Sequence, residues 1–297
     1  MIAEWMLAIY SLAFAPFVEY GFMRRALIAC VAIGLACGPI GTILVLRRMS
    51  LAGDAIAHAV LPGAAVGFIF FGLSLPAMTL GSFVAAALMA LVASFVTRWT
   101  SQKEDASFAS FYLIALALGV MLISTVGSKV DLLHFLFGSV LAIDTESLLM
   151  IAGASSLSIL VLSFIWRPLI LECFDPGFLR SVGGRGALVH QIFMLIVVLT
   201  LVSAFQALGT LMAVGLLMLP ATAAKFWCYG VIARSTLAAA FGALSGVLGL
   251  LVSYHANFPS GPSIVLVAGL LYLISLCLGS RDSFRLILFP TPQHKES

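Results

Sequence analysis

Long apolar stretches separated by short polar connections run through the chain, and they predict transmembrane helices. Each stretch is about 18–22 residues long, the length that an α-helix needs to cross about 30 Å of hydrocarbon. A transmembrane β-barrel would instead show segments of roughly ten residues with alternating polarity, and the sequence has none. We therefore predict an all-α, polytopic transmembrane helical bundle of eight to nine spans, built as one domain over residues 1–297. The nine predicted spans are 26–46, 54–71, 75–96, 108–127, 147–166, 188–205, 207–224, 236–254 and 262–279.

The segment before the first span is apolar but interrupted. Pro16 and Glu19 break residues 2–22, and aromatic side chains are frequent along them. This pattern is typical of an interfacial or re-entrant helix, so we predict that residues 1–25 form an interfacial N-terminal segment. Glu4 stands where a secretory signal peptide would carry positive charge, and we do not predict a signal peptide.

The overall composition supports a bilayer environment. Hydrophobic residues make up 62% of the chain and charged residues only 9%, whereas soluble proteins average roughly 25% charged residues. The five cysteines are scattered without a C-x-x-C pair, so we interpret them as apolar packing residues. We expect lipid around the chain and no nucleic-acid partner. Glycines four residues apart predict close helix approach: Gly34/Gly38, Gly63/Gly67 and Gly242/Gly246.

The distribution of Lys and Arg predicts the orientation in the membrane. Of the 15 basic residues, only Arg24, Arg25 and Lys129 fall on one side of the predicted spans, and the others fall on the opposite side. The positive-inside rule places the basic side in the cytoplasm. The C-terminus and the connection 167–187 are therefore predicted to be cytoplasmic.

One carboxylate and one imidazole interrupt the apolar sequence that follows a basic pair of residues. Asp54 and His58 are four residues apart, so they share one face of a helix. An ionisable residue within a span costs about 2.5–3.5 kcal/mol on insertion scales and is interpreted as functional by default. Oxygen and nitrogen donors one turn apart predict part of a divalent-cation site, with Ser50 extending the polar lining. The alternative is a structural polar pair that closes helix packing.

Two donors do not complete a metal site, because tetrahedral zinc takes four ligands. The other candidates for a polar path are His190, His255, Asp131 and His134. Asp131 and His134 share a helical face in the outer segment, where they would form a relay or a docking contact for another protein. For His190, the favoured interpretation is a solvated interfacial position. For His255, a simple interfacial position is at least as well supported as a metal-facing role.

The predicted cytoplasmic connection 167–187 combines charged and aromatic residues. It contains Glu172, Phe174, Asp175 and Phe178. A short amphipathic helix that presents aromatic side chains suits docking into a groove of a partner protein. The alternative is an ordinary solvated loop.

Six sequence blocks occur together in the order RRMSLAGDAIAHAVLPGAAVGF, KEDASFASFYLIALALGV, LLHFLFGSVLAID, ECFDPGFLRSVG, LGTLMAVGLLMLPATAA and NFPSGPSIVLVAGLLYLISL. Over nearly the whole chain they resemble the permease subunits of bacterial ATP-binding cassette importers for zinc, manganese and iron. The resemblance implies a homodimer in the inner membrane, two cytoplasmic ATPase subunits and a metal-loaded solute-binding protein outside. It also implies that Asp54 and His58 coordinate the transported metal, with no permanently bound cofactor, and that the loop with Phe174 and Asp175 seats on the ATPase.

The block KEDASFASFYL is closer to the zinc and manganese branches than to the iron branches, so we predict zinc, with manganese or iron as the alternative. The chain has no G-x-x-x-x-G-K-[ST] loop, so ATP would be hydrolysed by a separate subunit. Two other functions stay open at this stage. Gly153-Ala154-Ser155 with His190 or His255 as base would make an intramembrane hydrolase, and a chain that transports metal without an ATPase would be an ion-coupled carrier.

Overall fold

A computed structural model describes residues 14–72, 74–126 and 140–285, and these ranges consist of helices and short connections with no β-strand among them. The all-α, multi-span prediction is confirmed. Within these ranges, eight helices are long and apolar enough to cross a membrane. They are α3 (Gly21–Leu46), α4 (Ala52–Phe71), α5 (Leu75–Trp99), α6 (Glu104–Val126), α8 (Thr145–Phe174), α10 (Gly186–Leu208), α12 (Val231–Ala256) and α13 (Ser260–Leu278).

The seventh predicted span corresponds to a shorter helix, α11 (Thr210–Lys225). Its 16 residues extend only about 24 Å at about 1.5 Å per residue, less than the hydrocarbon thickness. α10 and α11 are separated at Gly209, whose φ of 82° lies in the left-handed region that glycine adopts without a steric penalty. The break therefore lies at Gly209, a few residues after the predicted turn near residue 206.

Several helices extend beyond their predicted spans, and two of these extensions bear on the predicted segments at residues 1–25 and 167–187. α3 begins at Gly21, so Arg24 and Arg25 belong to its first turns, and only the short helix α2 (Ala15–Glu19) precedes it among the described residues. Residues 1–13 of the predicted interfacial segment lie outside the described ranges.

The other extension is at the end of α8, which continues through residues 167–174, where the sequence predicted a connection. Leu169 is fully buried, and Ile170 and Cys173 pack against the core. This apolar contact keeps the chain helical beyond the predicted span. The remainder of the predicted connection contains the short helix α9 (Pro176–Ser181).

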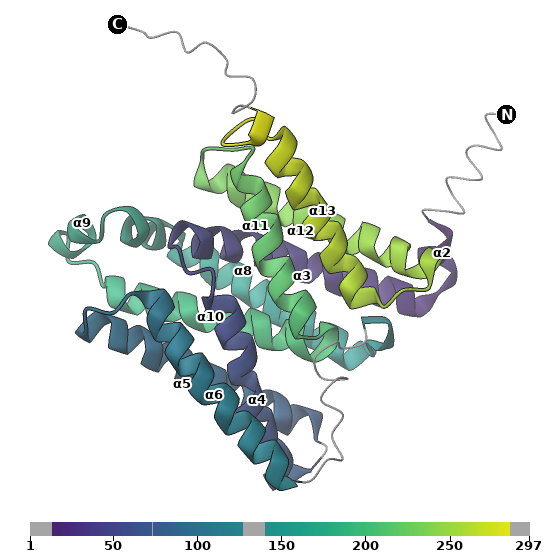
Figure 1. Ribbon diagram of the computed structural model, residues 1–297, viewed down its shortest axis with the longest axis horizontal. Helices are drawn as coiled ribbons and strands as arrows, with labels where there is room; N and C mark the ends of the chain where they lie inside the picture. The colour runs from purple at the N-terminus through teal and green to yellow at the C-terminus, as the bar shows by residue number, and fades with distance from the viewer. Residues whose placement is uncertain (1–13, 73, 127–139, 286–297) are drawn as a thin grey trace, which may run out of the picture.

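The helices form two groups with a pair between them (Figure 1). α4, α5 and α6 pack together at one end, and α3, α11, α12 and α13 pack together at the other. α8 and α10 pack on each other and contact both groups, α8 through α3 and α10 through α5. A turn at residues 47–51 joins α3 to α4 and so connects the two groups.

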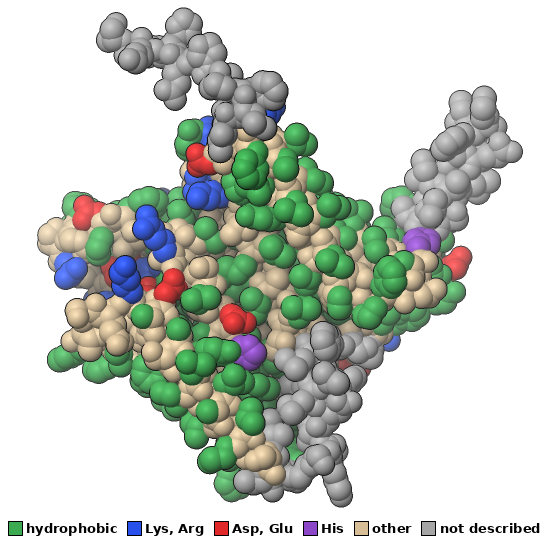
Figure 2. Space-filling view, in the orientation of Figure 1, with side chains coloured by type: hydrophobic (Ala, Val, Ile, Leu, Met, Phe, Trp, Pro, Cys, Tyr) green, Lys and Arg blue, Asp and Glu red, His purple; other side chains and the backbone are tan. Residues whose placement is uncertain are grey.

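The predicted glycine contacts are present. A Cβ at Gly38 would overlap the backbone of Ala239 on α12, and one at Gly63 would overlap the backbone of Gly81 on α5. Only a residue without a side chain permits such backbone approach. The outer surface is largely apolar, and charged side chains gather mainly at the end that carries α9 and near the end of α13 (Figure 2).

Candidate metal site

Asp54 and His58 lie on the first two turns of α4, on one face, as their spacing predicts. Asp54 Oδ1 lies 3.6 Å from Nε2 of His58. The side chain of Asp54 is 53% exposed and that of His58 is 23% exposed. The first turn of a helix favours a carboxylate because the free N–H groups there carry partial positive charge. The pair is therefore held in place by its helix and is still open to a ligand.

The His58 ring is held from the side by Tyr112 of α6, with ring centroids 5.1 Å apart. Its Nδ1 atom is buried without a hydrogen-bond partner, so Nε2 is the ring nitrogen that faces Asp54. A first-row metal ion bonded to both groups at about 2.1 Å would span the 3.6 Å gap. Across the part of the chain that is described, no group of three or more His, Cys, Asp or Glu residues could hold a metal ion. Within the described residues, the pair therefore stands as two donors without a third.

Among the residues that the structure describes, the other histidine candidates do not form a metal-binding cluster with this pair. Ser50 is exposed in the turn that precedes α4. His255 is exposed in the last turn of α12, with its ring against Tyr254 at 5.2 Å. Asp131 and His134 lie outside the described residues.

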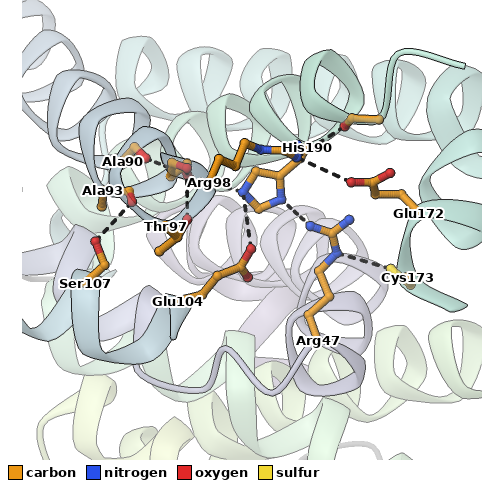
Figure 3. Close-up of polar contacts among 12 residues, drawn as sticks. Arg47, Ala90, Ala93, Thr97, Arg98, Glu104, Ser107, Glu172, Cys173 and His190 are labelled. Carbon is orange, nitrogen blue, oxygen red and sulfur yellow. Dashed lines mark hydrogen bonds and ion pairs between the residues drawn. The ribbon is translucent and has the colours of Figure 1, made fainter. Parts of the chain in front are cut away.

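The interpretation of His190 as a solvated interfacial histidine is wrong, since its side chain is completely buried. Nδ1 of His190 contacts Nη1 of Arg47, and Nε2 lies 3.3 Å from Oγ of Ser94 and 3.9 Å from Oε1 of Glu104 (Figure 3). The partners come from the end of α3, from α5 and from the start of α6. These helix ends close over the first turns of α10 and exclude solvent from the ring.

Sequence reasoning also missed the partners of His190. In the sequence, Arg47 belongs to the basic pair before the Asp54 segment, and Glu104 belongs to the block KEDASFASFYLIALALGV. Both stand beside the ends of apolar spans, where charged residues can fold back over a neighbouring helix. Their position beside the span ends was the one sequence feature that could have indicated contact with His190.

The four residues predicted to contact an ATPase divide into two types. Phe174 and Phe178 are 65% and 53% exposed. Asp175 caps α9, because its Oδ1 accepts a hydrogen bond of 2.8 Å from the backbone N–H of Phe178. Glu172 instead turns inward to Arg98 of α5, with 3.4 Å between Oε1 and Nη2. The two phenylalanines are exposed aromatic side chains of α9 and its flank.

Eight apolar spanning helices and a half-exposed carboxylate–imidazole pair on one of them are typical of a multi-span membrane transport protein. The chain matches the ABC 3 transport family over residues 19–279, and it belongs to that family. The resemblance predicted from the sequence blocks is confirmed.

Curated relatives match over nearly their whole length. The chain is 35% identical over 264 residues to the manganese import system permease protein ScaB of Streptococcus parasanguinis, covering 89% of this chain and 93% of the relative. It is 34% identical to the manganese transport system membrane protein MntC of Halalkalibacterium halodurans, covering 88% and 89%. It is 31% identical to the chelated iron transport system membrane protein YfeD of Yersinia pestis, covering 90% and 89%.

A solved structure, PsaBC from Streptococcus pneumoniae in complex with Fab, matches with a TM-score of 0.79 and 31% identity, over 97% of this chain and 100% of that one. The chain is therefore a multi-pass permease subunit of a metal-importing ATP-binding cassette transporter. Such a permease depends on separate ATPase and solute-binding partners, unlike an ion-coupled carrier. It is a transport protein and not an intramembrane hydrolase.

Proposed function

We propose that this permease imports manganese and that Mn²⁺ passes Asp54 and His58 on its way to the cytoplasm. The relatives named above include two manganese permeases and one for chelated iron. They support manganese, the alternative in the sequence prediction, better than zinc. Carboxylate and imidazole donors accept several first-row ions, so the pair itself is compatible with Mn²⁺.

The observation that carries this proposal is the open geometry of the pair. Asp54 Oδ1 and His58 Nε2 are 3.6 Å apart on the same face of α4, and both are partly exposed. A structural pair that only closed helix packing would be buried and directly hydrogen-bonded, because an unpaired buried carboxylate is costly. A carboxylate and a histidine nitrogen that are both partly exposed are free to bind a passing cation.

Two copies of the chain would complete the path. The described part of one chain offers two donors at this site, and a metal ion in transit needs further donors from water or from another chain. A second permease copy facing the first across α4 would supply a symmetric pair. This is the homodimer that the family resemblance implies.

The end of the molecule that carries α9 would face the ATPase in the cytoplasm. Phe174 and Phe178 present two exposed aromatic rings there, and aromatic anchors are typical of docking into a groove. The excess of Lys and Arg on this side of the spans supports a cytoplasmic location, with the C-terminus on the same side.

The test is transport by the complete complex in proteoliposomes, with its ATPase and its solute-binding protein. We expect ATP-dependent uptake of Mn²⁺ by the wild-type complex and none by Asp54→Ala, while Asp144→Ala, an exposed carboxylate at the start of α8, keeps wild-type uptake. Normal Mn²⁺ uptake by Asp54→Ala would contradict the path. Uptake of Zn²⁺ with no uptake of Mn²⁺ would contradict the choice of metal.

A further inference from the structure

The side chain of Arg47 joins three helices (Figure 3). Arg47 caps the C-terminus of α3, and its Nε donates to Sγ of Cys173 in the last turn of α8 at 3.2 Å. Its Nη1 donates to Nδ1 of His190 on α10, and the guanidinium carbon lies 5.9 Å from the centre of the Phe193 ring on the same helix. A guanidinium carries five N–H donors in a rigid fork, so one side chain can hold acceptors on two different helices.

His190, the acceptor for Nη1 of Arg47, is itself held by hydrogen bonds. Because a guanidinium can only donate, Nδ1 of His190 is the acceptor and the ring proton is on Nε2. Nε2 faces Oγ of Ser94 at 3.3 Å, and that hydroxyl in turn donates to the carbonyl of Ala90 at 2.7 Å. The histidine is completely buried, so water does not compete for these bonds. Arg47 is therefore anchored to α5 through α10 as well as to α8.

The contacts of Arg47 connect the end of α8 with the start of α4. On one side, Cys173 is adjacent to Phe174 and lies shortly before α9. On the other side, α4 begins at Ala52, and the turn between is held by a hydrogen bond of 3.0 Å from the N–H of Met49 to Leu44 and by burial of the Met49 side chain. Asp54 follows within the first turn of α4. A displacement of the end of α8 therefore reaches Asp54 through one side chain and one tight turn.

We propose that Arg47 is a positioning residue that couples movement of the α8–α9 end to the start of α4, and so ties ATP hydrolysis to the placement of Asp54 and His58. The proposal rests on the proposed function, in which α9 docks on the ATPase and α4 carries the metal. Lysine at this position would keep the charge but not the fork, so it would hold Cys173 or His190 and not both. Glutamine would lose the charge as well.

The test compares Arg47→Lys and Arg47→Gln with Arg48→Gln in the complete reconstituted complex. Arg48 is the exposed neighbour in the same turn, so Arg48→Gln makes the same change in charge without touching α8 or α10. The measured quantity is the number of Mn²⁺ ions imported per ATP hydrolysed. We expect this ratio to fall about fivefold in both Arg47 variants, as loss of a coupling contact of ordinary strength would cause, with ATPase activity within about twofold of wild type. Arg48→Gln keeps the wild-type ratio.

A wild-type ratio in both Arg47 variants overturns the proposal. A proportional loss of uptake and ATPase activity together with a lower melting temperature also overturns it, because that result describes a residue needed only for folding. If the Arg47 variants do not assemble, Cys173→Ala removes one acceptor without burying a new charge. It should lower the ratio about twofold, and an unchanged ratio then overturns the proposal. If the wild-type complex imports Zn²⁺ instead of Mn²⁺, the metal assignment fails, while the ratio measured with Zn²⁺ still tests Arg47.

Discussion

The Asp54–His58 pair and the cluster around His190 are two groups of polar side chains within the same helical bundle, and they differ in solvent access. The pair is partly exposed, with its nearest polar atoms 3.6 Å apart. His190 is completely buried and lies within hydrogen-bonding distance of Arg47 and Ser94. A buried polar group is stabilised only by fixed partners, whereas an open pair keeps lone pairs for a ligand. The difference in exposure thus distinguishes the Asp54–His58 pair, which is open to an ion, from the His190 cluster, which holds helix ends together.

The largest effect should follow from breaking the open pair. Asp54→Ala removes the only carboxylate at the site within the described residues. Loss of a residue that only supports a metal ligand lowers metal affinity or activity by about 10–100-fold. Loss of the ligand itself should therefore lower uptake by more than that. The melting temperature should stay at the wild-type value, since Asp54 is half exposed and its carboxylate lies beside His58 without a direct hydrogen bond to it. Uptake measurements and thermal unfolding of the same preparation test both halves. A large loss of thermal stability would mean that the pair is structural after all.

The buried cluster should show the reverse pattern. His190→Ala leaves Nη1 of Arg47 without its acceptor in the protein interior and removes the ring that faces Oγ of Ser94, which should lower the free energy of unfolding by about 1–3 kcal/mol. His190→Gln keeps an acceptor and should lose less. Thermal unfolding in detergent ranks the three proteins, and equal melting temperatures for His190→Ala and wild type would contradict the role of the cluster.

A smaller effect is expected at the edge of this cluster, where solvent enters. Arg98 and Glu172 form an ion pair of 3.4 Å between side chains that are 34% and 12% exposed. Partly solvated pairs of this kind contribute about 0–1 kcal/mol, so Glu172→Gln should lower stability less than His190→Ala. Thermal unfolding at low and high salt provides the check, because salt screens a solvated pair. A loss as large as that of His190→Ala would show that the edge is as closed as the centre.

The smallest effect should come from a fully exposed carboxylate outside both groups. Hydrogen bonds from the side chain and the backbone N–H of Ser147 hold the pKa of Asp144 below its ordinary value of 3.8. A lowered pKa in the folded state means that the contribution to stability is present at neutral pH and is lost as the pH falls below that value. Asp144→Ala should therefore melt slightly below wild type at pH 7, and the difference should shrink in acid. A difference that grows in acid would contradict this sign.

The sequence by itself determined the features that depend on neighbours along the chain. Apolar stretches of spanning length specify helices wherever they occur, so the all-α bundle and most of its spans could be predicted. The shared face of Asp54 and His58 follows from helical periodicity alone. The close glycine contacts were also predictable, because a four-residue spacing places both glycines on one face.

Only the tertiary structure decided which polar residues are open and which are closed. His190 is buried by Arg47, which is 143 positions away along the chain, and by Ser94, which is 96 positions away. Glu172 pairs with Arg98, which is 74 positions away along the chain. Local patterns carry no information on such distant neighbours, since the contacts form only when the helix ends meet in the folded bundle.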